Sequence, residues 1–431
     1  MARSSKSVSA FSGNGILFFI AFLFFFSGWL IIMAAKLSGA PVVRLPDLLP
    51  PAFMAASFLA VWLIVKISGF RGDPLIPLLT LLLAGIGLLV QFRLGILDFT
   101  DAPRASIYAY PLGLFIFLFA WMLFKSGRHA WLSGLAVPCL LAACVLLGGI
   151  LFFGSRFRGA VFLAGQLNPA ELVKLLLAVF LAGFIAEYRK PLQKTMAGLP
   201  APPVRTLLTL SALWLLPMGL LIVQRDLGMI ILLNLVLLVL VFMATGRWGY
   251  LVAGGAIAAL AAYAGFQLFA HARLRFIAWQ NPFSDPAGQG WQILQSLSAM
   301  FSGGMWGSGL GAGAPGAVPI AASDFIYAVV AEELGFVGCV FLAILYLSLF
   351  YRGYRAADQQ RNLFAQTLAA ALTTMLALQV LMNIGGVTKA IPLTGITLPL
   401  ISHGGSSLVT SFIMLGLLAA LSEPASGRAR G

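Results

Sequence analysis

The carboxylate best placed for chemistry is Asp285, in the segment Asn281-Pro-Phe-Ser-Asp-Pro286. The flanking prolines restrict the backbone around it to extended or turn geometry. A fixed carboxylate beside an apolar surface can act as a general base and accept a proton from a substrate hydroxyl. An aspartate between prolines is more often a turn former, so residue chemistry alone leaves both interpretations open.

A second ionisable pair opens a hydrophobic stretch. Glu171 and Lys174 lie three residues apart, which places them on one face of a helix. Charges within a membrane are costly and usually pair or line a polar cavity. We therefore predict an internal Glu171–Lys174 pair that shapes a cavity. The alternative is a plain helix start, with Asn168 as the N-cap, Pro169 in the first turn and Glu171 bonded back to the cap.

Basic residues gather on one predicted side of the membrane. Singly each is a solvated charge, whereas together they would bind an anionic headgroup. Asp226 is placed to cap the helix that follows it. The residues on this side that we group into such a site are Arg156, Arg158, Arg225, Arg273, Arg275 and Lys389.

Further acids flank the helix predicted at 326–350. Asp324 is predicted to cap it. Glu332 and Glu333 follow within the helix, and because adjacent residues face different directions, at least one is expected to point inward and need a partner.

A Pro- and Gly-rich segment precedes the last hydrophobic stretch. Residues 392–399 are predicted to be a broken, partly re-entrant segment, which leads into Ser402, His403 and Ser406. Irregular backbone at membrane depth persists where it lines a wet cavity or is buried in protein. Small residues also permit close helix packing, so a polar cavity and tight packing are the two interpretations.

The elements that must position these residues are membrane spans. The chain has 431 residues, of which 61% are hydrophobic and 9% charged, with a mean hydropathy of +0.99. A soluble domain carries roughly 25% charged residues, so this is predicted to be an all-α integral membrane protein. About twelve spans of suitable length are predicted, near residues 14–34, 52–69, 74–92, 106–124, 130–153, 170–187, 206–223, 227–244, 248–270, 326–350, 363–384 and 405–421.

Charge fixes the predicted orientation. Lys and Arg are in excess in the loops on the side of the N-terminus, so both termini are predicted to be cytoplasmic and the long loop at 271–325 to lie outside. The net charge of +14 then reflects anchoring to anionic membrane lipid rather than nucleic-acid binding. Cys139, Cys144 and Cys339 lie within apolar spans and are interpreted as core residues. We expect no metal site from any sequence motif.

Four segments together resemble the SEDS family (shape, elongation, division and sporulation). They are Asn168–Leu175 (NPAELVKL), Gln224–Gly228 (QRDLG), Trp306–Leu334 and Asn383–Ser407. The resemblance implies a polytopic bundle with a ten-helix core. It divides the chain into an N-terminal extension with two added helices at 1–73, a core at 74–422 and a cytoplasmic tail at 423–431.

The family resemblance implies a peptidoglycan glycosyltransferase of the bacterial cytoplasmic membrane, which polymerises lipid II into β-1,4 glycan on the outer face. It implies Asp285 as the general base and a class B penicillin-binding protein as the membrane partner. A divalent cation (Mg²⁺ or Mn²⁺) that assists the leaving group is the candidate cofactor. The implied substrate-binding residues are Arg156, Arg158, Glu171, Lys174, Arg273, Arg275, Lys389, Ser402, His403 and Ser406.

This sequence departs from the family pattern at several motif positions, among them Ala322-Ser323, where His-Thr is frequent, and the atypical Thr388-Lys389-Ala390. Arg225 stands where proline is usual, His403 where tyrosine is usual, and Asn168 where glutamine is usual. A flippase for lipid-linked precursors and a non-catalytic morphogenesis scaffold are the alternative functions. A transporter is expected to contain paired broken helices in two related halves, whereas this sequence predicts one broken segment, at 392–404. Elongation, division and sporulation roles are not separated by the sequence.

Overall fold

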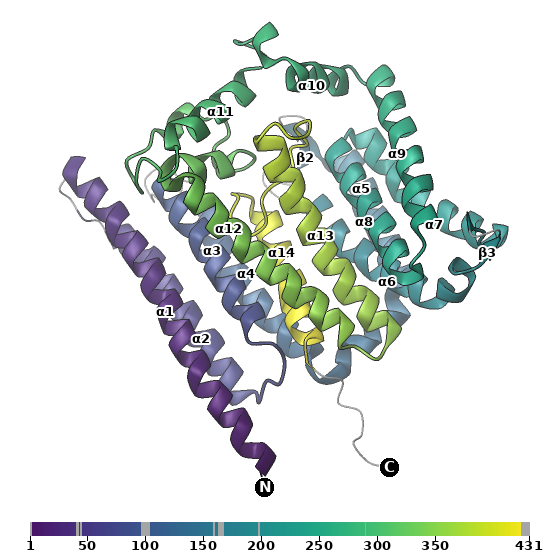
Figure 1. Ribbon diagram of the computed structural model, residues 1–431, viewed down its shortest axis with the longest axis horizontal. Helices are drawn as coiled ribbons and strands as arrows, with labels where there is room; N and C mark the ends of the chain where they lie inside the picture. The colour runs from purple at the N-terminus through teal and green to yellow at the C-terminus, as the bar shows by residue number, and fades with distance from the viewer. Residues whose placement is uncertain are drawn as a thin grey trace.

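The computed structural model describes residues 2–39, 43, 45–95, 104–157, 160–162, 168–196, 199–288 and 290–423. Figure 1 shows a bundle of long helices with shorter helices gathered at one end. The α-helices are α1 (Ala2–Gly39), α2 (Leu49–Ile67), α3 (Leu75–Arg93), α4 (Arg104–Phe124), α5 (Ala136–Phe153), α6 (Ala170–Leu192), α7 (Val204–Gln224), α8 (Leu227–Thr245), α9 (Trp248–Leu268), α10 (Ala270–Gln280), α11 (Trp291–Gly303), α12 (Ile326–Asp358), α13 (Leu363–Val387) and α14 (Gly405–Leu421).

Short elements complete the described part of the chain. The 3₁₀ helices are η1 (Leu45–Leu48), η2 (Lys125–Leu135), η3 (Pro282–Ser284) and η4 (Pro315–Ala317). Strands β1 (Ser155–Phe157) and β2 (Ala160–Phe162) pair antiparallel, as do β3 (Thr195–Met196) and β4 (Leu199–Pro200). These hairpins were not predicted, and they are too small to change the all-α class.

The predicted spans agree with the helices. Each of the twelve predicted stretches coincides with one of α1–α9 and α12–α14. Among the described residues, nine segments are long and apolar enough to cross a membrane, and one of them, Ala109–Phe153, contains most of α4 and all of α5. The prediction of a polytopic all-α membrane protein is confirmed.

Helix α13 lies at the centre of the bundle, in contact with α6, α8, α11, α12 and α14. Tight packing elsewhere depends on glycine. A Cβ on Gly113 of α4 would lie 2.4 Å from Cδ2 of Phe412, and one on Gly416 of α14 would lie 2.4 Å from the carbonyl oxygen of Phe117. Helices α4 and α14 therefore approach as closely as small residues allow.

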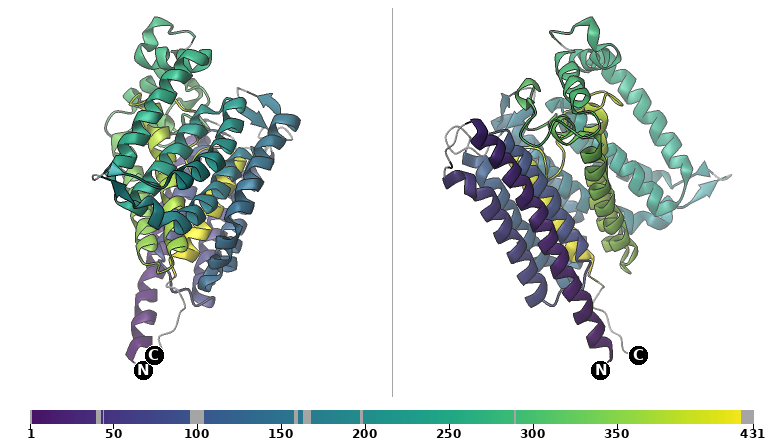
Figure 2. Two further views of the ribbon diagram at one scale, coloured as in Figure 1. Left: turned by 90° about the vertical axis from the view of Figure 1, so that its right-hand side faces the viewer. Right: turned by 60° about the vertical axis from the view of Figure 1, so that its left-hand side comes forward.

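Helices α1 and α2 pack against α3 along one side of the bundle (Figure 2). They form the part of the chain that was predicted to be an N-terminal extension. The division of the chain at residues 73 and 422 stays a prediction, because nothing in the fold separates these parts into independent units.

The predicted outer loop is more ordered than expected. Its sequence indicated a long irregular segment, but it contains α10, η3 and α11. Helix α11 packs against α12 and buries Ile293, Ser296, Ala299 and Gly303, which recur at helical spacing. This amphipathic pattern holds α11 on the bundle, so the helix forms despite the Gly-rich sequence around it.

Candidate active site

A cavity of about 520 Å³ opens at the end of the bundle that carries α10 and α11. Its volume is in the range of small-molecule binding sites, which is roughly 300–1,000 Å³. The polar lining residues are Arg275, Gln292 and Asp324, and the apolar ones are Ala278, Ile293, Ile320 and Leu393. The site thus combines a cation, a carboxylate and an amide with apolar walls.

Asp324 does not cap the following helix, so that prediction is wrong. Helix α12 begins at Ile326, its N-cap is Phe325, and no side chain bonds to the cap. The carboxylate lines the cavity instead. The physical reason is the turn at 319–325, which offsets Asp324 by one residue from the capping position.

Arg275 joins α10 to the irregular segment before α14. Its Nη1 lies 3.4 Å from the carbonyl oxygens of Leu393 and Thr394. A Cβ on Gly395 (φ +75°) would lie 3.8 Å from Oδ2 of Asp324 and 3.9 Å from Nη1 of Arg275. The guanidinium and the carboxylate therefore flank the same glycine, and residues 392–398 form no helix or strand, as predicted.

Asp285 is exposed and lies in the connection between α10 and α11. Its Oδ1 accepts a hydrogen bond from the Gly288 amide at 3.0 Å, and its carbonyl oxygen accepts one from the Gly290 amide at 2.9 Å. A Cβ on Gly288 would lie 2.3 Å from Oδ2 of Asp285. The turn-forming role is thus present, and the turn joins two helices that line the cavity, although Asp285 is not itself among the lining residues.

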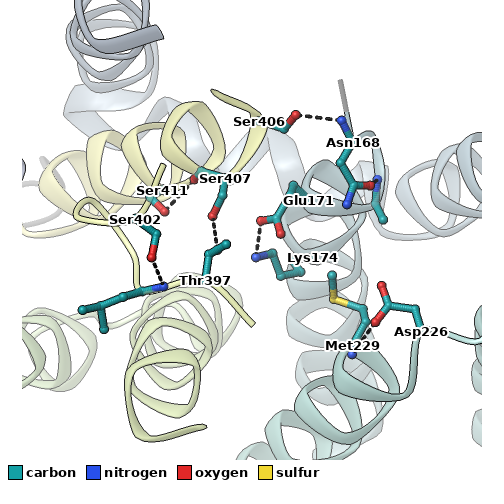
Figure 3. Close-up of polar contacts among 12 residues, drawn as sticks. Asn168, Glu171, Lys174, Asp226, Met229, Thr397, Ser402, Ser406, Ser407 and Ser411 are labelled. Carbon is teal, nitrogen blue, oxygen red and sulfur yellow. Dashed lines mark hydrogen bonds and ion pairs between the residues drawn. The ribbon is translucent and has the colours of Figure 1, made fainter. Parts of the chain in front are cut away.

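The predicted ion pair within α6 is present. The Lys174 ammonium contacts the Glu171 carboxylate, and their side chains are 2% and 13% exposed. Figure 3 shows this pair between α6 and the polar residues of α14. At such burial, each charge depends on the other for stabilisation.

The start of α6 differs by one residue from the prediction. Its N-cap is Pro169, not Asn168, and no side chain bonds to the cap. Asn168 still contributes, because its Oδ1 accepts a hydrogen bond from the Ala170 amide at 3.1 Å. Its own amide donates to Oγ of Ser406 at 2.8 Å, which joins α6 to α14 (Figure 3).

Asp226 caps α8, as predicted. Its Oδ1 accepts a hydrogen bond from the Met229 amide at 3.0 Å. Burial raises the pKa of the Asp226 carboxyl above its usual value. The Met229 amide and the positive charges of Lys174 and Arg275 oppose this rise, whereas the negative charge of Glu171 adds to it. The residue before it, Arg225, is exposed and ends α7 with a left-handed backbone (φ +63°).

Ser402 and His403 fix the loop before α12. The buried Ser402 hydroxyl donates to the carbonyl oxygen of Ser323 at 2.6 Å and accepts from the Leu398 amide at 2.8 Å. The His403 amide donates to the carbonyl oxygen of Ala322 at 2.6 Å. Burial lowers the pKa of the His403 imidazole, so the ring is neutral at physiological pH. Ser407 and Thr397 share a further hydrogen bond at 2.8 Å.

The structure brings together only some of the predicted basic residues. Lys389 contacts the end of α10, where its carbonyl oxygen accepts from Nε1 of Trp279 at 3.0 Å and its Nζ lies 3.5 Å from the carbonyl oxygen of Gln280. Arg273 is exposed on α10. The side chain of Arg156, in β1, and the whole of Arg158 lie outside the described residues.

Glu332 and Glu333 both find partners, and one partner was missed. Oε1 of Glu333 lies 2.9 Å from Nε of Arg93, and its Oε2 accepts from the Gly311 amide at 3.1 Å. Oε1 of Glu332 accepts from the Ala314 amide at 2.8 Å. Nothing in the sequence around Arg93 indicates this contact, because the two residues lie 240 positions apart.

Asn383 of α13 was also missed. Its Nδ2 donates to the carbonyl oxygens of Asp324 at 3.0 Å and Ile396 at 2.8 Å. It therefore ties both the turn before α12 and the irregular segment before α14 to the central helix. The sequence signal that could have identified it is a polar Asn within an otherwise apolar helix.

Comparison with known proteins assigns the chain to a family. The family model described as cell cycle protein, which covers FtsW, RodA and SpoVE, matches residues 73–426. Peptidoglycan glycosyltransferase RodA of Mycobacterium tuberculosis is 36% identical over 368 residues, covering 82% of this chain and 78% of the relative. Stage V sporulation protein E of Bacillus subtilis is 33% identical over 361 residues, covering 80% and 95%.

Solved structures agree with this assignment. A chain of a peptidoglycan synthase complex that coordinates polymerization and crosslinking matches with a TM-score of 0.65 and 30% identity, covering 83% of this chain and 99% of that chain. Thermus thermophilus RodA, a rod shape determining protein, matches with a TM-score of 0.59 and 27% identity, covering 83% and 98%. Because the family model matches well over half of the chain, the protein belongs to the FtsW, RodA and SpoVE family of cell cycle proteins.

Proposed function

We propose that the protein is a peptidoglycan glycosyltransferase that polymerises lipid II on the outer face of the bacterial cytoplasmic membrane. The observation that carries this proposal is the cavity between α10, α11 and residues 392–395, which presents Arg275 and Asp324 next to the turn that holds Asp285. Relatives named peptidoglycan glycosyltransferase support the reaction class.

Asp285 is proposed as the general base. Its carboxylate accepts the proton of the acceptor 4-hydroxyl as that oxygen bonds to the anomeric carbon of the donor sugar. The bond between the anomeric carbon and the pyrophosphate oxygen breaks, and undecaprenyl pyrophosphate leaves with the electron pair. Attack from the opposite face inverts the anomeric carbon and gives the β-1,4 link.

The cations near the cavity are proposed to hold the leaving group. Arg275 and Lys389 lie at the α10 edge, and Arg273 follows the same exposed helix. As the pyrophosphate gains charge, fixed cations stabilise the transition state more than the ground state. Arg156 and Arg158 are proposed to join this group from the loop after α5.

The polar network at α6 and α14 is proposed to shape the floor of the site. Glu171 and Lys174 are proposed to orient the disaccharide, together with His403 and Ser406. Because the hydroxyl of Ser402 is already bonded on both sides, we assign it to positioning of the loop rather than to direct contact.

The partner is proposed to be a class B penicillin-binding protein, since a similar chain belongs to a synthase complex that couples polymerization with crosslinking. Among the described residues, no group of three or more His, Cys, Asp or Glu side chains is arranged to hold a metal ion. No step of the proposed reaction is derived through a metal ion. The predicted Mg²⁺ or Mn²⁺ is checked by measuring polymerisation in EDTA and after readdition of each ion.

The test of the base compares Asp285→Asn with Asp285→Ala in lipid II polymerisation, with the purified protein and its class B partner. Asparagine keeps an oxygen that accepts from the Gly288 amide but cannot take a proton, so it separates the base from the turn former. Loss of a general base lowers the rate by about 10²–10⁴-fold. Asp358→Asn, an exposed aspartate at the end of α12, is the matched control and is expected to retain the rate.

The outcomes of this test distinguish a general base from a turn former at Asp285. A large loss in both Asp285 variants with unchanged thermal stability supports the base. Full activity of Asp285→Asn with loss only in Asp285→Ala would leave Asp285 as a turn former. Absence of glycan chains from the wild type would overturn the proposed polymerase function and would favour the alternative functions, a flippase or a non-catalytic scaffold.

A further inference from the structure

The outer end of α1 packs against a glycine-rich loop that follows α11. We call residues Gly307–Ala314 the glycine loop. A Cβ on Gly311 (φ +86°) would lie 2.8 Å from Cβ of Ala35 in α1, and one on Gly28 would lie 4.0 Å from Cδ1 of Leu310. Figure 1 shows the upper end of α1 beside this loop. At Gly311, helix and loop therefore meet with no room for an additional side chain.

The opposite side of the glycine loop is held by charged groups. The two acids of α12, Glu332 and Glu333, accept its amides, and Nη2 of Arg93 donates to the carbonyl oxygen of Gly313 at 2.9 Å. The loop is thus enclosed between α1 on one side and α3 and α12 on the other. These contacts hold the glycine loop from both sides.

The end of α1 is itself anchored. Lys36 forms an ion pair with Asp47 at 2.5 Å, and Nε1 of Trp29 donates to the carbonyl oxygen of Asp47 at 3.0 Å. The Lys36 ammonium lies 5.8 Å from the centre of the Phe92 ring, one residue before Arg93. Because α1 is fixed to η1 and α3 at the height of the glycine loop, it can resist outward movement of that loop.

The glycine loop leads directly into the cavity wall. Along the chain it is followed by Ile320 and Asp324, which line the cavity. Between them, Ala322 and Ser323 accept the hydrogen bonds that hold residues 402 and 403. A shift of the loop would therefore move two lining residues and loosen their tie to the segment before α14.

We propose that α1 is a clamp that holds the glycine loop against Glu332 and Glu333, with Ala35 as a positioning residue for the cavity. This inference rests on the proposed glycosyltransferase function for its effect on rate, but the clamp itself is a statement about structure. It gives the N-terminal extension a role within the catalytic unit, although the match to the family begins only at residue 73.

The test uses Ala35→Leu with Ala34→Leu as the matched control. Both changes add the same atoms to the same helix, but Ala34 is exposed whereas Ala35 contacts Gly311. Ala35→Leu is expected to raise hydrogen exchange of the Gly311 and Ala314 amides on the order of tenfold, because the larger side chain forces α1 away from the loop, which can then separate from its acceptors. It is also expected to lower kcat for lipid II on the order of tenfold, since small displacements of a site reduce rate strongly.

A third variant, Ala35→Ser, keeps the space and is expected to keep both exchange and kcat. Unchanged exchange in Ala35→Leu would overturn the clamp, and so would a fall in kcat that Ala34→Leu shows equally. Raised exchange with wild-type kcat would overturn the positioning role. If the wild type makes no glycan, the proposed function fails, while the exchange comparison still decides whether α1 holds the loop.

Discussion

Removing the cation from the Arg93–Glu333 pair is predicted to destabilise the protein by about 3 kcal/mol, because it leaves a buried carboxylate without its counter-ion. The perturbation is Arg93→Met, which keeps the length of the side chain and removes its charge. The Glu333 side chain is 4% exposed and its Oε1 lies 2.9 Å from Nε of Arg93. The amide of Gly311 still donates to Glu333, so the cost falls at the lower end of the range for broken buried pairs, roughly 3–5 kcal/mol.

The chain supplies a matched control. Arg352 pairs with Asp73 at 3.3 Å, and the Arg352 side chain is 24% exposed, as is that of Arg93. Its partner is 19% exposed, so water can solvate the carboxylate that remains. Arg352→Met is therefore expected to cost no more than about 1 kcal/mol.

The assay is reversible unfolding in mixed micelles with increasing SDS, followed by circular dichroism. The free energy of unfolding is measured for Arg93→Met, Glu333→Gln and the double variant. Removing both charges avoids the uncompensated ion, so the double variant is expected to be more stable than Arg93→Met alone. Additive effects within about 0.5 kcal/mol would show that the two side chains are not coupled and would refute this reasoning.

Three further predictions concern the bundle. Asp226→Asn keeps the cap of α8 and removes a charge that burial disfavours. The pKa of this carboxyl is raised above its usual value of 3.8, so its ionisation lowers the stability of the wild type as the pH rises above that value. The variant is therefore expected to be at least as stable as the wild type at pH 7. In thermal melts, the difference in stability between the two is expected to shrink toward pH 4. Lys174→Met leaves Glu171 buried without a partner and is expected to cost about 3 kcal/mol by the same SDS titration, with partial recovery in the double variant with Glu171→Gln. Gly416→Ala places a methyl 2.4 Å from the Phe117 carbonyl oxygen and is expected to lower stability by about 1–3 kcal/mol. Gly148→Ala, whose methyl meets no atom within 4 Å, is the control and is expected to be neutral or stabilising. Equal melting midpoints of the two variants would contradict the close packing of α4 and α14.

The sequence predicted what is set by local rules. The length of each apolar run determines a span, the three-residue spacing of Glu171 and Lys174 determines their pairing, and Asp226 caps the helix that follows it at once. The amphipathic spacing in α11 was also readable and was overlooked because prolines and glycines surround it.

Contacts between distant parts of the chain were not predictable in this way. The pairing of Arg93 with Glu333 and the bond from Ser402 to Ser323 depend on which helices become neighbours in the fold. Composition and local spacing do not predict which helices these are. Asp324 shows how a local rule fails. A carboxylate just before a helix resembles a cap, but the preceding turn directs this one into a cavity.

The placement of Asp285 depends on the segment that follows α13. Helix α10 is tied to it by the bonds of Trp279 to Lys389 and of Arg275 to Leu393. Helix α11 is tied to it by the buried Ser296 hydroxyl, which donates to the carbonyl oxygen of Val387 at 3.3 Å. Because both helices that flank the Asp285 turn rest on residues 387–394, the end of the central helix and the segment after it fix the position of that turn. The turn's own hydrogen bonds then orient the side chain, so the turn-forming role is compatible with the proposed role of Asp285 as a base.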